Sequence, residues 1–212
     1  MIQQLQPHDL LRIEGSRFLV PADASSRAAI ESCLRHAPFV VVRRALMKDG
    51  FVPVGIRGQD RAERYAAWLD PQGVCAVLKP EALRTSGKAR NLAALAALRE
   101  CEQRFRSLHH PWGPTGSTGF ELASGIATVT ETSDLDVLIH MMERPLDREL
   151  FAIADACNDL PCVFDLQIAT PHGAFALREY RNGGSRLLLR TCSGPVLVID
   201  PWKPVNLCNI PA

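Results

Sequence analysis

The sequence predicts an α+β fold with two unequal domains, a smaller one over residues 1–84 and a larger one over residues 85–212. First, helix-like and strand-like segments mix along the chain without the regular strand–helix alternation of a parallel sheet. Second, hydrophobic periodicity disappears over residues 79–88, where we place the domain boundary. Third, 212 residues are enough for a small domain beside a medium one.

The smaller domain is expected to contain both helices and strands. Residues 25–36 have capping residues before them, apolar residues at helical spacing and a proline after them, which predicts a helix. Residues 39–44 and 51–56 are rich in β-formers, and the Asp-Gly pair between them is typical of a hairpin turn. Residues 59–69 are predicted to form a second helix, because their apolar side chains recur at helical spacing.

The larger domain begins with the clearest helix of the chain, over residues 88–104, which are rich in Ala and Leu. A loop rich in Gly and Pro follows at residues 109–119. The other elements expected are strands at 126–130, 135–140 and 162–169, helices at 118–123 and 146–158, and apolar segments at 187–191 and 196–199.

Composition excludes several classes of protein. A formal net charge of +1 gives no global basic field, so we expect no nucleic-acid partner. No apolar run approaches the roughly 20 residues that span a bilayer, and the first residues lack the pattern of a signal peptide, so we expect no membrane partner. The seven cysteines are scattered and form no C-x-x-C pair, which indicates reduced thiols and a cytoplasmic protein.

Two acids stand at the start of an apolar strand. Asp134 and Asp136 flank Leu135, and residues two apart in a strand point to the same side. Two carboxylates on one side suit Mg²⁺, a hard cation that takes oxygen ligands and completes its shell with water and phosphate. A lone Asp-x-Asp is more often a capped turn at a strand end, so this pair needs further support.

Two other features supply that support. Gly116-Ser117 ends the glycine-rich loop just before a short helix, where backbone N–H groups can approach phosphate. Asp165 lies in the middle of an apolar strand, where a buried carboxylate is costly without a neighbouring cation. The alternative for Asp165 is an exposed position on an edge strand.

Together these residues resemble the DNA polymerase β-like nucleotidyltransferases, whose signature is Gly-Ser, an Asp-h-Asp-h strand and a third carboxylate downstream. Gly116-Ser117, Asp134-Leu135-Asp136-Val137 and Asp165 occupy these places in order. The 16 residues between Ser117 and Asp134 form a longer spacer than is usual in the superfamily. The resemblance implies a nucleotidyltransferase-like mixed sheet with flanking helices.

The wider sequence is similar to one branch, the malonate decarboxylase holo-acyl-carrier-protein synthases, also called phosphoribosyl-dephospho-CoA transferases. The motifs that carry this resemblance are WGPTGSTGFELASG at 112–125, TSDLD at 132–136, TPHGAFAL at 170–177, LLRT with GP and DPW between 188 and 202, and in the smaller domain VRRA at 42–45 and VGIRG at 54–58 with Arg61 and Arg64. It therefore extends over nearly the whole chain.

The resemblance implies a reaction and its partners. Phosphoribosyl-dephospho-CoA would pass from 2'-(5''-triphosphoribosyl)-3'-dephospho-CoA to a serine of the apo acyl carrier protein subunit of malonate decarboxylase, with release of pyrophosphate. Asp134 and Asp136 would hold two Mg²⁺ ions. Asp165 would complete the metal site nearest the serine, and Gly116 and Ser117 would bind the departing pyrophosphate.

Arginines in the smaller domain are candidates for phosphate binding. The basic set comprises Arg43, Arg44, Arg57, Arg61 and Arg64. Of these, Arg57, Arg61 and Arg64 are predicted to contact the triphosphate, and the spacing of the last two would place them on one helix face. A solvated basic surface is the alternative for each residue, as it is for Arg178 and Arg190.

Two other functions are compatible with the motifs. One is a nucleotidyltransferase that uses ATP or CTP on a small molecule, RNA or protein. The other is a non-catalytic adaptor that binds a carrier protein through a degenerate transferase fold. The presence of Asp134, Asp136 and Asp165 together argues against the adaptor.

Overall fold

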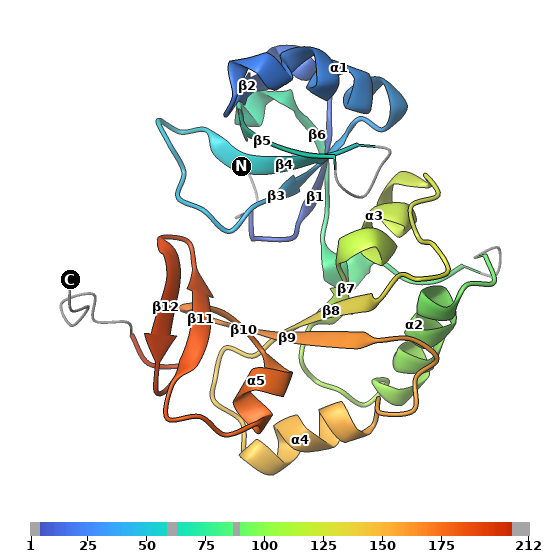
Figure 1. Cartoon of the computed structure of the whole chain (residues 1–212), viewed down its shortest axis with the longest axis vertical. Helices are drawn as coiled ribbons and strands as arrows, with labels where there is room; N and C mark the ends of the chain where they lie inside the picture. Colours follow the sequence, from blue (N-terminus) through green and yellow to red (C-terminus); the bar gives the residue numbers. More distant parts are fainter. Residues whose placement is uncertain (1–4, 59–62, 87–89, 205–212) are drawn as a thin grey trace.

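The predicted α+β class is confirmed by a computed structural model, which describes residues 5–58, 63–86 and 90–204. Within these residues lie two six-stranded sheets, one in each half of the chain. Figure 1 shows the N-terminal sheet above the C-terminal sheet, with one face of each turned toward the other. None of the helices in the described ranges is long and apolar enough to cross a bilayer.

The N-terminal sheet has the strand order β2-β5-β4-β3-β1-β6, with antiparallel pairing throughout. Its strands are β1 (Leu10–Ile13), β2 (Leu19–Pro21), β3 (Phe39–Val42), β4 (Val52–Arg57), β5 (Arg64–Leu69) and β6 (Val74–Leu78). Helix α1 (Arg27–His36) covers one face, where Ile30 packs with Leu11 and Val54 in a buried cluster. The predicted hairpin is confirmed, since Asp49 and Gly50 at its tip have φ angles of 51° and 82°.

The helix predicted over residues 59–69 is wrong where the structure describes it. Arg64–Leu69 forms strand β5, which pairs with β4 along its whole length, from Arg57↔Arg64 to Val52↔Leu69. Residues 59–62 lie outside the described ranges. Strand β4 is central in the sheet and needs hydrogen-bond partners on both edges, and this long-range pairing outweighs the local apolar spacing.

The C-terminal sheet has the order β12-β11-β10-β9-β8-β7 and is antiparallel except for the parallel pair β8 and β9. Its strands are β7 (Trp112–Pro114), β8 (Leu135–His140), β9 (Phe164–Thr170), β10 (Gly173–Ala176), β11 (Leu187–Thr191) and β12 (Gly194–Val198). Helices α2 (Ala93–Arg104), α4 (Asp147–Asp155) and α5 (Leu177–Arg181) pack on one face over the largest buried cluster.

Two further expectations for this domain need correction. The strand predicted over residues 126–130 is absent from this described segment, because the N–H groups of Thr128 and Val129 donate to the Glu121 carboxylate, each at 2.8 Å, instead of to a strand. Helix α2 begins at Ala93, not at residue 88; residues 90–92 are not helical, and residues 88 and 89 lie outside the described ranges.

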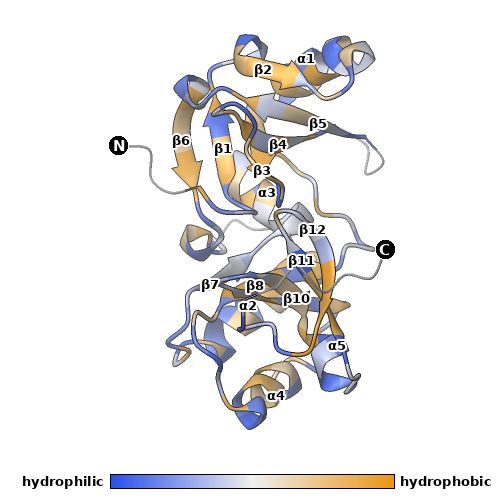
Figure 2. Ribbon diagram, turned by 90° about the vertical axis from the view of Figure 1, so that its left-hand side faces the viewer, coloured by the Kyte–Doolittle hydropathy of each residue, from blue (hydrophilic) through white to orange (hydrophobic). Residues whose placement is uncertain are grey.

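Helix α3 (Gly116–Ser124) joins the two halves. Phe120 of α3 is buried with Leu10 and Phe39 of the N-terminal sheet, and the Phe39 and Phe120 ring centroids are 6.5 Å apart at 73°. In Figure 2 the hydrophobic colour is concentrated in the strands, while α1 and α4 alternate between hydrophobic and hydrophilic turns as surface helices do. The sheet faces that α1, α2, α4 and α5 leave uncovered therefore look toward each other beside α3.

Candidate active site

A cavity of about 850 Å³ lies between the two uncovered sheet faces. The N-terminal sheet contributes residues that lie on one of its faces. Gly55 is the register partner of Val41 and Ala66, and Arg57, two residues later on β4, is the register partner of Arg64. The C-terminal sheet contributes, among others, Asp136, Gln167, Leu188 and Arg190. Both domains and the start of α3 thus build a single site.

Two of the predicted acids are neighbours on adjacent strands. Asp136 of β8 is the register partner of Asp165 of β9, and register partners in a parallel pair point to the same face. Asp134, two residues before Asp136, immediately precedes β8. Leu135 and Val137 point the other way into the core, with 0% and 1% of their surface exposed. The strand alternation used in the sequence argument therefore holds for Asp136 and Asp165, which share one face of the sheet, and Asp136 lines the cavity.

Metal-binding capacity rests on carboxylate pairs rather than on a closed cage. Among the described residues, no three His, Cys, Asp or Glu side chains are gathered closely enough to enclose a metal ion. Mg²⁺ commonly takes only one or two carboxylates and completes its octahedral shell with water and substrate phosphate. The adjacent Asp136 and Asp165 match that donor set, with Asp134 next along the chain.

Gly116 lies directly against one of these acids. Its φ angle is +58°, and a Cβ at this position would overlap Oδ2 of Asp136. The backbone N–H of Thr115 donates to the Asp136 carbonyl at 2.9 Å, which fixes the loop to strand β8. Glycine is therefore required here both for its backbone angle and for the close approach of the carboxylate.

Ser117 follows in the first turn of α3, and its carbonyl accepts a hydrogen bond from the Thr128 hydroxyl at 2.9 Å. Arg90 ties the same region together by donating to Glu121 and to the Val129 carbonyl. The long spacer before Asp134 is thus folded back on α3. The Gly-Ser pair therefore remains next to the acids although the spacer is long.

The structure describes two of the three arginines that were predicted to bind phosphate, Arg57 and Arg64. Arg57 of β4 and Arg64 of β5 are register partners on neighbouring strands, and both line the cavity with Gly116 and Asp136. The Arg57 guanidinium lies 5.9 Å from the centroid of the Phe120 ring. Arg64 is on a strand, so the shared helix face predicted for Arg61 and Arg64 is wrong for Arg64, and Arg61 lies outside the described residues.

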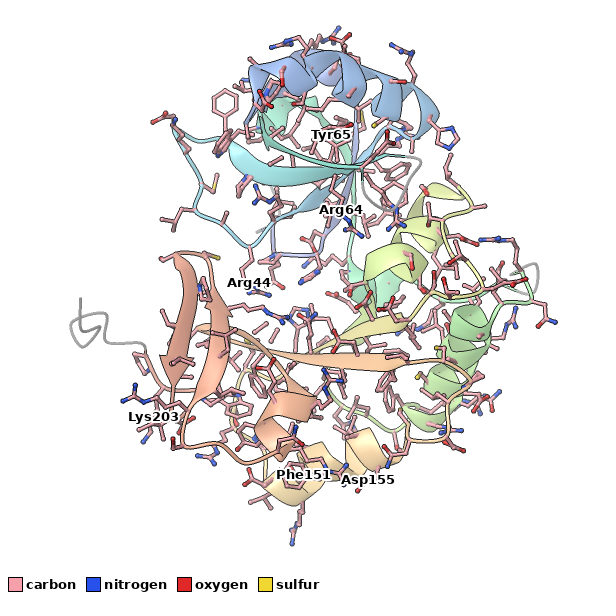
Figure 3. The ribbon with its side chains drawn as sticks, in the orientation of Figure 1. Arg44, Arg64, Tyr65, Phe151, Asp155 and Lys203 are labelled. Carbon is pink, nitrogen blue, oxygen red and sulfur yellow. The ribbon has the colours of Figure 1, made fainter. Side chains whose placement is uncertain are left out.

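A second basic group lines the cavity on the side of β11 and β12. It contains Arg44, Arg190 and His8. Figure 3 shows Arg44 beside these two strands and Arg64 nearer to α3. Burial, and to a smaller extent the charges of Arg44, His140 and Arg190, lower the pKa of His8 from 6.5 to about 4.

Sequence reasoning missed part of this second group. His8 precedes the first strand and has a left-handed φ angle of 77°, and no local pattern marks either fact. For Arg190, the sequence leaves a solvated basic surface as the alternative to phosphate binding. Gln167 could have been found, because it lies two residues after Asp165 on the same strand face.

Comparison with known proteins covers nearly the whole chain. A family model described as the phosphoribosyl-dephospho-CoA transferase MdcG N-terminal domain matches residues 6–80, and one described as the MdcG C-terminal domain matches residues 82–201. Two curated proteins named phosphoribosyl-dephospho-CoA transferase are similar: one from Azotobacter vinelandii is 39% identical over 94% of this chain and 95% of its own, and one from Pseudomonas fluorescens is 42% identical over 96% and 98%. No solved structure gives a significant match.

Proposed function

The chain belongs to the phosphoribosyl-dephospho-CoA transferase family, and we propose that it attaches this group to an acyl carrier protein of malonate decarboxylase. The donor is 2'-(5''-triphosphoribosyl)-3'-dephospho-CoA and the acceptor is a serine of the apo carrier protein. The observation that carries the proposal is the pairing of Asp136 with Asp165, where Asp136 lies against Gly116 and lines a cavity together with arginines.

The proposed reaction is a displacement at the α-phosphorus. The serine Oγ forms a bond to the α-phosphorus, and the bond from that phosphorus to the bridging oxygen breaks. Pyrophosphate leaves with the electron pair, and the serine proton passes to a carboxylate oxygen. Asp165 is the proposed acceptor of this proton, since it lies beside Asp136 on the cavity side of the sheet.

We propose that Asp134, Asp136 and Asp165 hold Mg²⁺, and the adjacent Asp136 and Asp165 fit its ordinary ligand set of one or two carboxylates. When bound, Mg²⁺ neutralises charge on the phosphate oxygens and lowers the cost of the displacement. Asp136 and Asp165 lie at the start of β8 and β9, where the paired strands fix their positions.

Binding of the triphosphate is assigned to α3 and the N-terminal sheet. The backbone N–H groups at the start of α3, including that of Ser117, are positioned to donate to the departing pyrophosphate beside Gly116. Arg57 and Arg64 provide charge-assisted hydrogen bonds from the opposite wall of the same cavity. Residues 1–84 would thus act as a substrate-binding domain beside the catalytic residues 85–212.

Cytoplasmic location is also proposed. The described cysteines are free thiols, among them the buried Cys33, Cys101 and Cys157. Buried thiols without disulfides are typical of proteins from a reducing compartment.

The test is mass spectrometry of the apo carrier protein after incubation with the protein, Mg²⁺ and the triphosphoribosyl precursor. The expected result is a mass increase equal to phosphoribosyl-dephospho-CoA on one serine, with one pyrophosphate released per modified carrier. Modification by ATP or CTP instead would support a general nucleotidyltransferase. Carrier binding without any modification would support an adaptor, and either outcome would overturn the proposal.

A further inference from the structure

The cavity carries its positive charge in two places. Its arginines are Arg43, Arg44, Arg57, Arg64 and Arg190, whereas Asp136 is the one carboxylate among the described lining residues. The formal net charge of the whole chain is only +1, so this concentration of cations belongs to the cavity and not to a basic protein surface in general. The lining therefore suits a ligand with several negative charges.

Strand order separates the two cationic groups. His140, Ala169, Ala174 and Arg190 form one register row across β8, β9, β10 and β11, so Arg190 shares the face of Asp136 but stands three strands away. At about 4.8 Å between neighbouring strands, the separation from β8 to β11 is roughly 14 Å. Arg190 is also level with His140, four residues further along β8 than Asp136, so a triphosphate held beside Gly116 and Asp136 does not reach Arg190 as well.

We propose that Arg44 and Arg190, with His8, form a second anion subsite that binds the 5'-diphosphate linking adenosine to the pantetheine arm of the precursor. The assignment rests on the proposed function, because that function supplies a ligand with two polyanionic groups. Arg57 and Arg64 bind the triphosphate near Gly116, and the two ribose rings span the space between the subsites.

His8 is built into the second subsite. Its backbone N–H donates to the Val42 carbonyl at 2.9 Å, and its φ angle of 77° turns the chain so that the side chain lines the cavity. A non-glycine residue in this conformation is uncommon and is concentrated at functional sites. Burial depresses the pKa of its ring, and the charges of Arg44 and Arg190 lie close enough to lower it as well. A bound diphosphate would offset that repulsion.

The strands next to Arg190 also suit the arm that follows the diphosphate. Leu188 and Leu197 are register partners on β11 and β12, and 37% and 61% of their surfaces are exposed. They lie on the same sheet face as Arg190 and Pro195, which pair with each other. An apolar strip leading away from the second subsite gives the pantetheine arm a surface on which to lie.

Isothermal titration calorimetry with two probes separates the subsites. Dephospho-CoA has the 5'-diphosphate but no triphosphate, and inorganic tripolyphosphate with Mg²⁺ has the reverse. For Arg44→Ala and Arg190→Ala we expect Kd for dephospho-CoA to rise about tenfold or more with little change for tripolyphosphate. For Arg57→Ala we expect the opposite pattern.

Arg148→Ala is the matched control, because Arg148 lies on α4 on the far side of the C-terminal sheet and should change neither Kd. Arg190→Lys keeps the charge without the planar fork and should give an intermediate Kd for dephospho-CoA. The proposal is overturned if wild type does not bind dephospho-CoA, or if Arg44→Ala and Arg190→Ala leave its Kd unchanged or weaken both probes equally. Transfer to the carrier protein is measured separately, so a failure of the proposed function would be seen as intact dephospho-CoA binding without transfer.

Discussion

Gly116 shows how one residue connects the glycine-rich loop to Asp136. With φ at +58° and Asp136 against its Cα, an alanine there is strained and also displaces the carboxylate. We expect Gly116→Ala to cost about 1–3 kcal/mol of stability and to lower kcat about hundredfold, since small displacements of reacting groups are expensive. Denaturant unfolding and steady-state transfer kinetics measure the two effects.

Gly125→Ala is the matched control for Gly116→Ala. Gly125 also has a positive φ, +73°, but a Cβ there meets nothing within 4 Å. We therefore expect a loss of stability with kcat unchanged. Equal kcat in Gly116→Ala and Gly125→Ala would contradict the claim that Gly116 makes room for Asp136.

His8 gives the stability a pH dependence with a defined sign. Its pKa is about 4 in the folded chain against 6.5 as the ordinary value, so between pH 6.5 and 4 the unfolded chain binds a proton that the folded chain does not. Stabilisation from neutral His8 is full above pH 6.5 and is lost as the pH falls toward 4. The shift corresponds to about 3 kcal/mol at most, and solvent screening at this half-buried side chain reduces it to about 1–2 kcal/mol.

His8→Asn removes this titration and keeps a residue that tolerates left-handed φ. We expect the unfolding free energy of wild type to fall relative to His8→Asn between pH 7 and pH 4.5, as measured by urea unfolding at each pH. If the unfolding free energies of wild type and His8→Asn differ by the same amount at both pH values, the pKa of His8 is not depressed.

At the scale of single residues, the sequence predicted what depends on strand alternation and missed what depends on tertiary contact. Asp136 lies on the face opposite to Leu135 and Val137 because the period of a strand is two. The contact of Gly116 with Asp136 and the position of His8 depend on how distant segments fold together. No local pattern reports such contacts.

Helix α3 is the element that joins the domains and starts at the candidate active site. Phe120 is 3% exposed and contacts the N-terminal sheet through Phe39. We expect Phe120→Ala to cost about 3–5 kcal/mol and to raise KM for the precursor, because the wall that carries Arg57 loses its contact with α3. Thermal unfolding and initial-rate kinetics check both effects.

Phe151→Ala on α4 is the comparison for Phe120→Ala. Phe151 packs against Tyr180 on the far face of the C-terminal sheet, with ring centroids 6.4 Å apart. Its loss should lower stability and leave KM unchanged. If Phe151→Ala raises KM as much as Phe120→Ala, then α3 has no special role in positioning the two walls. Phe120→Leu preserves most of the buried volume and keeps the comparison usable if Phe120→Ala unfolds.

The error at β5 shows what limits prediction at the scale of elements. Tyr65, Ala66 and Leu69 fit a helical stripe, yet Ala67 and Leu69 are the buried pair in the strand, at 1% and 0% exposure. Short apolar segments fit both the helical period and the strand period. Here the strand forms because β4 needs a hydrogen-bonded partner. By contrast, α1, α3, α4 and β8 were predicted because caps, glycines or length settle their type locally.

At the scale of the whole molecule, the N-terminal sheet supplies the wall opposite the acids. Arg64 lines the cavity from β5, so we expect Arg64→Ala to raise KM for the precursor about tenfold and to leave KM for the carrier protein unchanged. Arg35→Ala, at the exposed end of α1, should change neither value. A higher KM for the carrier protein alone would place Arg64 on a docking face instead.

The two-sheet arrangement could not be derived from sequence, because the facing of two domains is decided by scattered contacts such as those of Leu10, Phe39 and Phe120. What the sequence did predict was a long precursor held where arginines of one domain meet the acids of the other. The cavity lined by Arg57, Arg64 and Asp136 has that composition.

The pairing of Asp136 with Asp165 is tested most directly by Asp165→Asn, which keeps the size of the side chain and removes its charge and basicity. In the presence of Mg²⁺ we expect precursor Kd close to that of wild type and transfer to the carrier protein slower by about 10²–10⁴-fold. Asp134→Ala and Asp136→Ala should likewise abolish transfer with the fold intact, and the exposed Glu143→Gln should behave as wild type. Single-turnover transfer by Asp165→Asn within tenfold of the wild-type rate would contradict the assignment of these acids as the catalytic site.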